Sequence, residues 1–384
     1  MNLTNDILTR SIEAKLLKSL VPNKVIVLLG PRRIGKTVLL NRLLRKIDEP
    51  SIFLNGEDIT THELLNRRSI QNYENILGGK RLLIIDEAQN IEGIGRILKL
   101  MIDGISGLKI IVTGSSAFDI ANVTGEPLTG RKKTFFLYPI SEKEYRTIEA
   151  PNQYKDNLDK RLIYGNYPEL LHLESKEDKV DYLNEILNSY LLKDILTLDK
   201  IRNSNKIFNL LRLIAFQIGN EVSNQELGRQ LGMSKNTVER YLDLLSKVFV
   251  IHQLGGFSKN LRKEVTKSSK WYFYDNGLRN ILIANMNPIS LRNDIGQLWE
   301  NYLISERLKQ QTYDGKIVNR YFWRTYDGQE IDLIEEKEGR LDAFEIKWGT
   351  HRNVKVPPKW SESYDDARFS IIDQTNYYDW ISEK

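Results

Sequence analysis

Apolar runs alternate with stretches of helical spacing along residues 1–140 of the chain. Five short runs have the length and composition of buried strands, namely Val25–Leu29, Ser51–Asn55, Arg81–Ile85, Lys109–Thr113 and Lys133–Leu137. Helical patterns lie between the runs, and an amphipathic pattern from Asp6 to Leu20 precedes the first. Because parallel strands need crossover helices, this alternation predicts an α/β domain with a parallel five-stranded sheet and helices on both faces.

The pattern changes after residue 140. Residues 141–203 are mainly helical, with the clearest helices expected at Lys160–Leu171 and Lys179–Thr197, and we interpret them as a lid on the first domain. Residues 204–284 predict a winged helix-turn-helix. Its three helices are expected at Lys206–Ile218, 224–231 and Lys235–Phe249, and strand-like alternation follows from Val250 to Tyr274.

Residues 285–384 predict one more α/β domain. A helix is expected at Leu291–Gln310, and strands are expected at Arg320–Arg324, Glu330–Glu335 and Leu341–Trp348. The pattern therefore divides the chain into four domains, with bounds 1–140, 141–203, 204–284 and 285–384.

Composition narrows the possible chemistry. The 384 residues contain no cysteine, which excludes disulfides, thiolate zinc sites and cysteine nucleophiles, and the four histidines show no metal-ligand spacing. A net charge of +5 permits a nucleic-acid partner without requiring one. No apolar run could span a bilayer and the N-terminus lacks a signal-peptide core, so we expect a cytoplasmic protein with no membrane partner.

The first strand is followed by a glycine-rich segment with the spacing G-x-x-x-x-G-K-T, the pattern of a P-loop. Its glycines let successive backbone N–H groups cradle phosphate oxygens at a helix N-terminus. Lys36 would reach the β- and γ-phosphates of ATP, and the Thr37 hydroxyl would bind Mg²⁺. The expected nucleotide-binding residues are Gly30, Pro31, Arg32, Arg33, Ile34, Gly35, Lys36, Thr37 and Val38. The alternative is a chance glycine turn before a helix.

The third apolar run ends in Asp86 and Glu87. Acids at the carboxyl end of a central strand lie where open α/β sheets place their sites. Asp86 is expected to hold Mg²⁺, and Glu87 to orient and polarise an attacking water as the catalytic acid–base residue. This is the Walker B arrangement.

An arginine, Arg131, stands just before the fifth apolar run. It could reach the γ-phosphate bound by a neighbouring subunit as an arginine finger. A solvated basic loop is the alternative interpretation on spacing alone.

Basic residues mark the second module as a candidate DNA-binding surface. Lys235, Asn236 and Arg240 are expected on the exposed face of the recognition helix. Further basic residues lie in the wing segment, namely Lys259, Arg262, Lys263, Lys267 and Lys270. They would contact DNA phosphates, although winged helices also act as protein–protein spacers.

The last domain carries the pattern Asp332 followed by Glu345-Ile346-Lys347. Alternate residues of a strand share a face, so Glu345 and Lys347 project together while Phe344, Ile346 and Trp348 face a core. Asp332 and Glu345 would form a carboxylate pair for Mg²⁺, with Lys347 as a catalytic residue that positions hydroxide. Glu300 could support the metal. The alternatives are a salt-bridged sheet face or a nuclease fold without activity.

Taken together, these motifs resemble a prokaryotic family of AAA-type ATPases. The resemblance rests on G-P-R-R-x-G-K-T, on L-L-I-I-D-E-A-Q, and on F-W-R…G-x-E-I-D-L-I…F-E-I-K near the C-terminus. It covers nearly the whole chain, and its C-terminal half looks like the domain of unknown function that usually follows such ATPases. The resemblance implies ATP as ligand, Mg²⁺ as cofactor, and a homo-oligomer such as a hexameric ring. Leu128–Arg131 matches the family's Leu-x-Gly-Arg segment, which favours Arg131 as the finger.

Two further roles follow from the resemblance. Ser115, after the fourth apolar run, would touch the γ-phosphate or the water, although a helix-capping serine is an equal alternative. Asn55, at the end of the second run, would restrain the catalytic acid. We therefore expect an ATP hydrolase that couples nucleotide state to a DNA-binding winged helix and a nuclease-like domain. A regulatory ATP switch and a protein-remodelling ring without nuclease activity are the alternatives.

Overall fold

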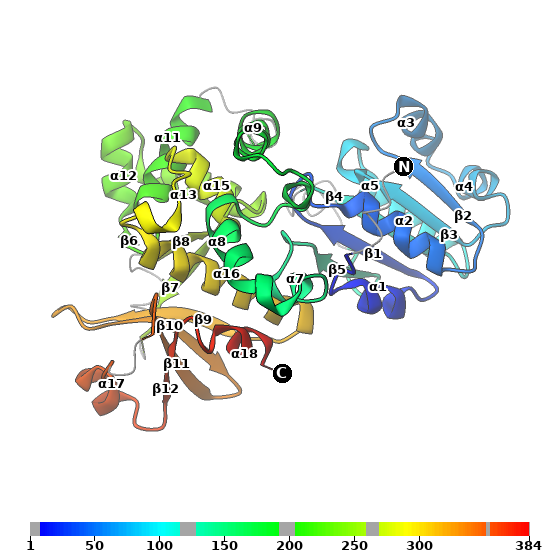
Figure 1. Cartoon of the computed structure of the whole chain (residues 1–384). Coiled ribbons are helices and arrows are strands. Elements are labelled where there is room, and N and C mark those ends of the chain that lie inside the picture. The colour runs from blue at the N-terminus through cyan, green and yellow to red at the C-terminus, as the bar shows by residue number, and fades with distance from the viewer. Residues whose placement is uncertain (1–7, 116–127, 192–203, 259–268, 351–353, 384) are drawn as a thin grey trace. The chain divides into compact units, whose positions relative to one another are not determined.

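The structure is a computed structural model, and it describes residues 8–115, 128–191, 204–258, 269–350 and 354–383. The chain divides into two compact units, which are described separately below. The first comprises residues 1–140 with 247–249, and the second comprises residues 141–246 with 250–384. The labels of Figure 1 are used for the helices and strands.

The first unit is built on the expected parallel five-stranded sheet. Its strand order is β2-β3-β4-β1-β5, and every neighbouring pair is parallel. The strands are β1 (Lys24–Leu29), β2 (Ser51–Asn55), β3 (Leu82–Asp86), β4 (Lys109–Gly114) and β5 (Lys132–Phe136). All five residues of β3 are buried, as expected for a strand covered on both faces.

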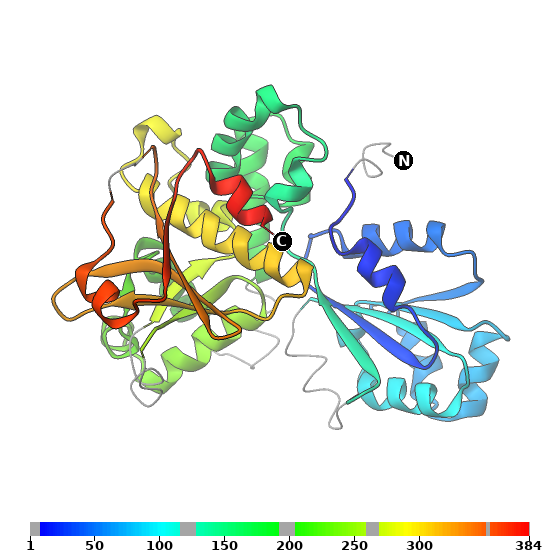
Figure 2. The ribbon, with the colours of Figure 1, turned by 90° about the horizontal axis from the view of Figure 1, so that it is seen from below.

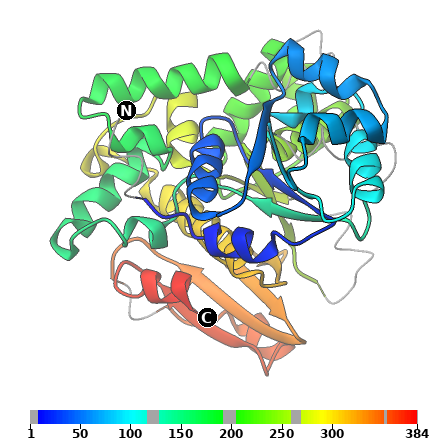
Figure 3. The same cartoon turned by 90° about the vertical axis from the view of Figure 1, so that its right-hand side faces the viewer.

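Five helices of the described ranges accompany this sheet: α1 (Glu13–Ser19), α2 (Lys36–Lys46), α3 (Ile59–Asn66), α4 (Ile70–Leu77) and α5 (Ile94–Gly104). Right-handed crossovers place α2 on one face, and α4 and α5 on the other, because the chain moves in opposite directions across the sheet. Figure 3 shows helices on both sides of the strands. The carboxyl ends of β1, β3 and β4 therefore meet at one uncovered edge.

The second unit begins with short helices in the region expected as a lid: α7 (Glu142–Tyr145), α8 (Tyr154–Tyr164) and α9 (Lys176–Glu185), which a π-helical turn extends to Leu191. The helix expected at Lys160–Leu171 instead begins at Tyr154 and stops at Tyr164. Gly165 ends it with φ 82°, and a Cβ there would collide with the carboxylate of Asp275. Residues 192–197 of the next expected helix lie outside the described residues.

The remaining helices of this unit are α11 (Ser204–Phe216), α12 (Asn224–Leu231), α13 (Lys235–Lys247), α15 (Asn276–Leu282), α16 (Ile295–Asp314), α17 (Pro358–Ser363) and α18 (Tyr377–Ser382). Ser223 caps α12 by accepting a hydrogen bond from the Glu226 N–H, and Gly232 ends it in the left-handed region. Two helices with a short turn between them thus lie at the position where the sequence predicts a helix-turn-helix.

One seven-stranded sheet runs through the second unit, in the order β12-β11-β10-β9-β7-β8-β6. Its strands are β6 (Glu221–Val222), β7 (Ile251–Gly256), β8 (Ser269–Phe273), β9 (Asn319–Arg324), β10 (Glu330–Lys337), β11 (Arg340–Ile346) and β12 (Arg368–Ile372). The sheet crosses the boundary expected between residues 284 and 285, because β7 pairs with β9 at Gly255–Tyr321 and Gly256–Phe322. The expected wing and the C-terminal strands therefore lie in one sheet.

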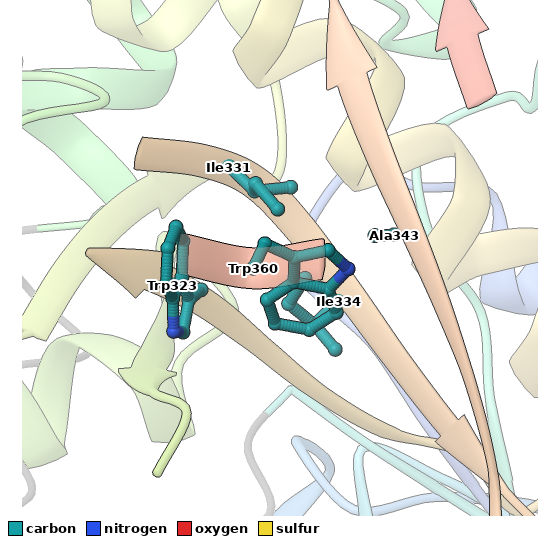
Figure 4. Close-up of a cluster of buried hydrophobic side chains, with 5 residues drawn as sticks. All are labelled: Trp323, Ile331, Ile334, Ala343 and Trp360. Carbon is teal, nitrogen blue, oxygen red and sulfur yellow. The ribbon is translucent and has the colours of Figure 1, made fainter. Parts of the chain in front are cut away.

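Both faces of the C-terminal strands are covered by aromatic cores. On one face Trp323, Ile331, Ile334 and Ala343 pack around Trp360 of α17 (Figure 4). On the other face Phe344 contacts Trp380 and Trp348 contacts Trp299, so α16 and α18 cover that side (Figure 2). This burial matches the core face that the sequence predicts for β11.

Candidate functional site

Glycine fixes the shape of the P-loop at two positions. A Cβ on Gly30 would collide with the carbonyl oxygen of Leu137, which follows β5, and Gly35 adopts φ 88° just before α2 begins at Lys36. An L-amino acid with a side chain would be displaced at the first position and strained at the second. The loop thus presents the first turn of α2 to the open edge of the sheet.

Lys36 is held against the loop that precedes it. Its ammonium donates hydrogen bonds to the carbonyl oxygens of Gly30 and Pro31, at 3.1 Å each. It also lies 3.7 Å from a carboxylate oxygen of Glu87, and its side chain is only 4% exposed. The cation is therefore aimed at the enclosed space of the loop rather than at solvent.

Two hydroxyls hold both oxygens of the Asp86 carboxylate. Thr37 donates to Oδ2 at 2.6 Å, and Thr113 of β4 donates to Oδ1. Thr113 also accepts the backbone N–H of Glu87 at 2.9 Å. Thr113 was not singled out from the sequence, although its place in the strand order, between the P-loop strand and the acidic strand, could have indicated it.

Glu87 occupies a strained backbone position and is held by a glutamine. Its φ of 49° is unusual for a residue with a side chain. Gln89 Nε2 lies 2.5 Å from Glu87 Oε2 and 3.3 Å from Ser115 Oγ, so one amide links the acid to the end of β4. Asn55, expected to restrain this acid, instead accepts the N–H of Glu57 at 2.9 Å. The side-chain oxygen of Asn55 thus caps the turn after β2.

Arg10 is a residue that sequence patterns missed. Its guanidinium is buried and donates to the carbonyl oxygen of Ile34 in the P-loop at 3.0 Å and to that of Tyr138 at 2.6 Å. It therefore ties the loop to the chain after β5. No local motif surrounds Arg10, so only the fold reveals this role.

Arg131 lies at the opposite edge of the sheet from the P-loop of its own chain. Its carbonyl oxygen accepts the N–H of Val25 at 2.9 Å, which places it beside the start of β1, whereas the P-loop follows the end of β1. Its side chain is 41% exposed and donates to Asp103 at 2.5 Å. The fold thus keeps this arginine away from a nucleotide in the same subunit.

A second constellation lies in the other unit and is called the acid cluster below. It comprises the acids Glu300, Glu330, Asp332 and Glu345 together with Lys270 and Lys347. Lys347 lies 2.6 Å from Glu345, as the shared face of β11 predicts. Asp332 accepts the N–H of Ile346 at 2.8 Å and thereby takes the place of a ladder carbonyl.

A β-bulge brings Asp332 into the cluster. On β9 Trp323 and Tyr321 are two positions apart, but on β10 their partners Ile331 and Ile334 are three positions apart. Both isoleucines therefore face the same core (Figure 4). The extra residue lets the Asp332 side chain reach the Ile346 N–H of β11. Simple alternation along the strand does not reveal this irregularity.

Glu300 of α16 joins the cluster from the helix, with its side chain 13% exposed. It accepts the Tyr272 hydroxyl at 2.6 Å and lies 3.8 Å from Lys270. Burial, reinforced by the neighbouring charge of Asp332, raises the pKa of Glu300 to about 8. Burial also raises the pKa of Asp332 and that of Glu345.

Lys270 corrects one expectation for the wing. It is 1% exposed and contacts Glu330 as well as Glu300, so its charge is used inside the protein and does not face DNA phosphates. The other basic wing residues, Lys259, Arg262, Lys263 and Lys267, lie outside the described residues. On α13 the expected contact residues Lys235, Asn236 and Arg240 are exposed.

Within the described ranges, no three histidine, aspartate or glutamate side chains lie close enough together to form a metal site. Asp332, Glu345 and Glu300 therefore do not make up a three-carboxylate centre as they stand. A helix able to span a membrane is absent from the part of the chain that the structure describes.

Comparison with known proteins agrees with the geometry of the first unit. Residues 22–146 match the family model of the AAA domain. The first unit is an AAA-type P-loop domain. Residues 155–289 and 295–378 match two models that are each described as a domain of unknown function, DUF8612 and DUF4143. The junction between them lies within the unit that contains the acid cluster.

Relatives of similar length are uncharacterised. An uncharacterised protein of Mycobacterium tuberculosis is 27% identical over 88% of this chain and 73% of its own length. Another, of Methanocaldococcus jannaschii, is 27% identical over 92% of this chain and 81% of its own length. Among solved structures, the Walker-type ATPase PABY2304 of Pyrococcus abyssi is 17% identical, with a TM-score of 0.45, and covers 72% of this chain and 96% of that one.

Proposed function

We propose that the AAA domain binds ATP with Mg²⁺ and hydrolyses it. The observation that carries this proposal is the convergence of Lys36, Thr37 and Asp86 at the edge of the sheet, around a loop whose Gly30 leaves no room for a Cβ. The lysine is hydrogen-bonded to loop carbonyls, and phosphate oxygens would offer it stronger, charged acceptors in their place. The residues present thus fit the nucleotide.

Each polar group at this edge has a role in the proposal. Thr37 and Asp86 would hold Mg²⁺, which neutralises phosphate charge when bound. The expected loop residues from Gly30 to Val38 enclose the phosphates. Glu87 orients a water, and Ser115 lies beside it through Gln89.

Arg131 acts in this proposal on the nucleotide of a neighbouring copy. Its position at the far edge of its own sheet, with the side chain 41% exposed and paired at the surface with Asp103, supports a role in trans. Such an arrangement requires a homo-oligomer, for which a ring, hexameric or otherwise, is the closed form.

We propose further that the second unit acts on DNA. Lys235, Asn236 and Arg240 would contact the duplex from α13. Asp332 and Glu345 would hold Mg²⁺ with support from Glu300, and Lys347 would stabilise charge at the phosphate. The assembly of these residues around a bulge supports the nuclease-like interpretation.

One observation favours a second candidate function, a regulatory ATP switch whose C-terminal part binds without cleaving. Asp332 already accepts the Ile346 N–H, and Lys347 already pairs with Glu345, so these residues are engaged by groups of the protein itself. A protein-remodelling ring would share this feature, with the winged helix contacting protein.

A paired assay of ATP hydrolysis and metal-dependent DNA cleavage separates these functions. The nuclease assignment predicts that Asp332→Ala and Lys347→Ala abolish cleavage while ATP hydrolysis persists. Cleavage that survives both substitutions would remove that assignment. Hydrolysis without any cleavage, under either Mg²⁺ or Mn²⁺, would favour the switch. A duplex gel shift over a salt series distinguishes phosphate contacts, which give a steep salt dependence, from protein contacts.

A further inference from the structure

A cavity of about 330 Å³ opens in the second unit where β7 and β9 end beside β6. Its wall includes Phe257, Phe322, Arg324, Tyr326, Glu221 and Gly256. The volume lies at the lower end of the range for small-ligand sites, roughly 300–1,000 Å³. Among the described residues, neither those of the P-loop nor the expected DNA-contacting residues of α13 line this cavity.

Aromatic rings and a guanidinium dominate this wall. Tyr326, in the turn after β9, is 104% exposed, whereas Phe322 is buried to 3% and supports the cavity floor. Arg324 is half exposed, so its planar group is available beside the rings. In proteins that bind single-stranded nucleic acids, the bases stack on exposed aromatic side chains and on the planes of arginine guanidinium groups.

A polar edge accompanies the rings. Glu221 and Arg324 lie 3.3 Å apart, and both side chains remain partly exposed. A carboxylate accepts hydrogen bonds from the exocyclic amino group of a base, and a guanidinium donates to base carbonyls or to phosphate. The pair therefore offers both an acceptor and a donor to the edge of a planar ring held by the aromatic wall.

Gly256 keeps the cavity open. A Cβ at this position would lie 3.5 Å from the ring of Phe322, in ordinary contact, and no positive φ strains the site. A larger side chain would therefore extend across the ring and fill the space above it. The preceding Gly255 offers a matched control, because a Cβ there meets nothing within 4 Å.

The cavity adjoins the acid cluster. Arg324 lies 3.8 Å from Glu330, Glu330 contacts Lys270, and Lys270 lies over the ring of Phe322 at 5.3 Å. A nucleic-acid strand with one base in the cavity would therefore place its sugar–phosphate backbone beside the acid cluster, which contains Asp332.

We propose that this cavity binds an unstacked nucleobase of a single-stranded nucleic acid and so brings the adjoining phosphodiester to the acid cluster. This inference rests on the proposed action of the second unit on DNA and names the form of DNA that it takes. Tyr326 supplies the stacking surface, Phe322 forms the buried floor, and Glu221 and Arg324 contact the base edge.

The test is fluorescence anisotropy of the full chain with labelled oligothymidine and oligocytidine, and with a labelled duplex for comparison. Gly256→Leu and Tyr326→Ala are each expected to weaken single-strand binding about tenfold, the loss of one stacked base, while duplex binding changes less than twofold. Gly255→Leu is expected to bind both DNAs as the wild type does. Tyr326 is fully exposed, so its truncation does not threaten folding.

The outcomes separate this inference from the proposed function. Unchanged single-strand affinity in both Gly256→Leu and Tyr326→Ala would overturn the cavity assignment, even if the wild type hydrolyses ATP and binds duplex DNA. Equal losses for single strands and duplex would also overturn it. Failure of the wild type to hydrolyse ATP, with single-strand binding still sensitive to both substitutions, would refute the ATPase proposal and leave the cavity assignment standing.

Discussion

At the P-loop, Lys36 rests on backbone carbonyls of a glycine-rich loop, whereas in the acid cluster Lys270 lies between two carboxylates. Both lysines are buried. Phosphate oxygens can replace neutral carbonyls as acceptors at little cost, because the new bonds are charge-assisted. A lysine paired with Glu300 and Glu330 has no such exchange available, because removing it would leave two partly buried acids without this counter-charge.

The two regions therefore differ in how easily a ligand can replace the present contacts of the lysine. In the AAA domain the Lys36 ammonium donates to neutral carbonyl oxygens and lies 3.7 Å from Glu87, whereas in the acid cluster both lysines contact carboxylates directly. Chemistry at the cluster requires a metal or substrate that repays the breaking of existing contacts such as Lys347–Glu345. We therefore expect the AAA domain to bind nucleotide readily. We expect activity in the second unit to depend on a metal or substrate that displaces the existing contacts.

The largest expected effect concerns Arg131. Arg131→Ala should lower the rate of ATP hydrolysis by about 10³-fold, the size typical of an arginine finger, while ATP affinity stays close to wild type. The neighbouring exposed Lys132 gives a matched control, Lys132→Ala, which should retain activity.

Mixing sharpens that test. Arg131→Ala and Glu87→Gln should each be strongly impaired alone, but a mixture of the two should recover part of the activity, since one mixed interface then contains both intact groups. Lack of recovery in an assembled mixture would show that Arg131 does not act across subunits.

Glu87→Gln alone should reduce hydrolysis by about 10²-fold with ATP affinity retained, because only the proton-accepting group is lost. Steady-state rates and calorimetric affinities provide the comparison. A variant that loses binding and hydrolysis together would place Glu87 among the binding groups, through its contact with Lys36.

A smaller effect is expected at the residue that holds this acid. Gln89→Ala should slow hydrolysis about tenfold by freeing the Glu87 carboxylate, with little change in ATP affinity. Asn55→Ala should change the rate less than twofold, because Asn55 bonds only its own turn among the contacts described. Gln89→Glu, which cannot donate the same hydrogen bond, should behave like the alanine variant. The reverse ranking of Asn55 and Gln89 would contradict the geometry.

In the acid cluster we expect a pH dependence of stability. Glu300 has a folded-state pKa of about 8, above its ordinary 4.5, so the folded state binds the proton more tightly than the unfolded state. Its contribution is complete below about pH 4.5 and is lost as pH rises toward 8, at about 1.4 kcal/mol per pH unit at most.

Thermal unfolding with and without the Glu300→Gln substitution isolates this term, in buffers free of divalent cations. The glutamine keeps an acceptor for the Tyr272 hydroxyl, so the variant should lose pH dependence between pH 4.5 and 8 but not the hydrogen bond. Charged neighbours Asp332, Glu330 and Lys270 remain in both proteins. Identical pH profiles would show that Glu300 ionises normally.

Local sequence patterns predicted the AAA sheet well. The five expected strands appear within one or two residues of their predicted bounds, because buried parallel strands are continuous apolar runs. The P-loop was equally accessible, since two glycines and a lysine at fixed spacing report a local backbone shape. Glu345 and Lys347 also share a face, as strand periodicity requires.

What the sequence could not provide depends on long-range register. The bulge at Asp332, the pairing of β7 with β9, and the burial of Lys270 all arise from contacts between segments distant in sequence. Arg10 and Gln89 carry no local pattern of their own and gain their roles only where the fold places them. Asn55 was expected, by analogy with other ATPases, to restrain the catalytic acid, but its side chain accepts a hydrogen bond within a local turn.

The most direct test of the central claim is isothermal calorimetry of ATP binding with and without Mg²⁺, on the wild type and Lys36→Ala. The account predicts magnesium-dependent ATP binding by the wild type that Lys36→Ala abolishes, with the exposed-lysine variant Lys132→Ala behaving as wild type. Absence of magnesium-dependent ATP binding in the wild type, or binding that Lys36→Ala leaves unchanged, would contradict it.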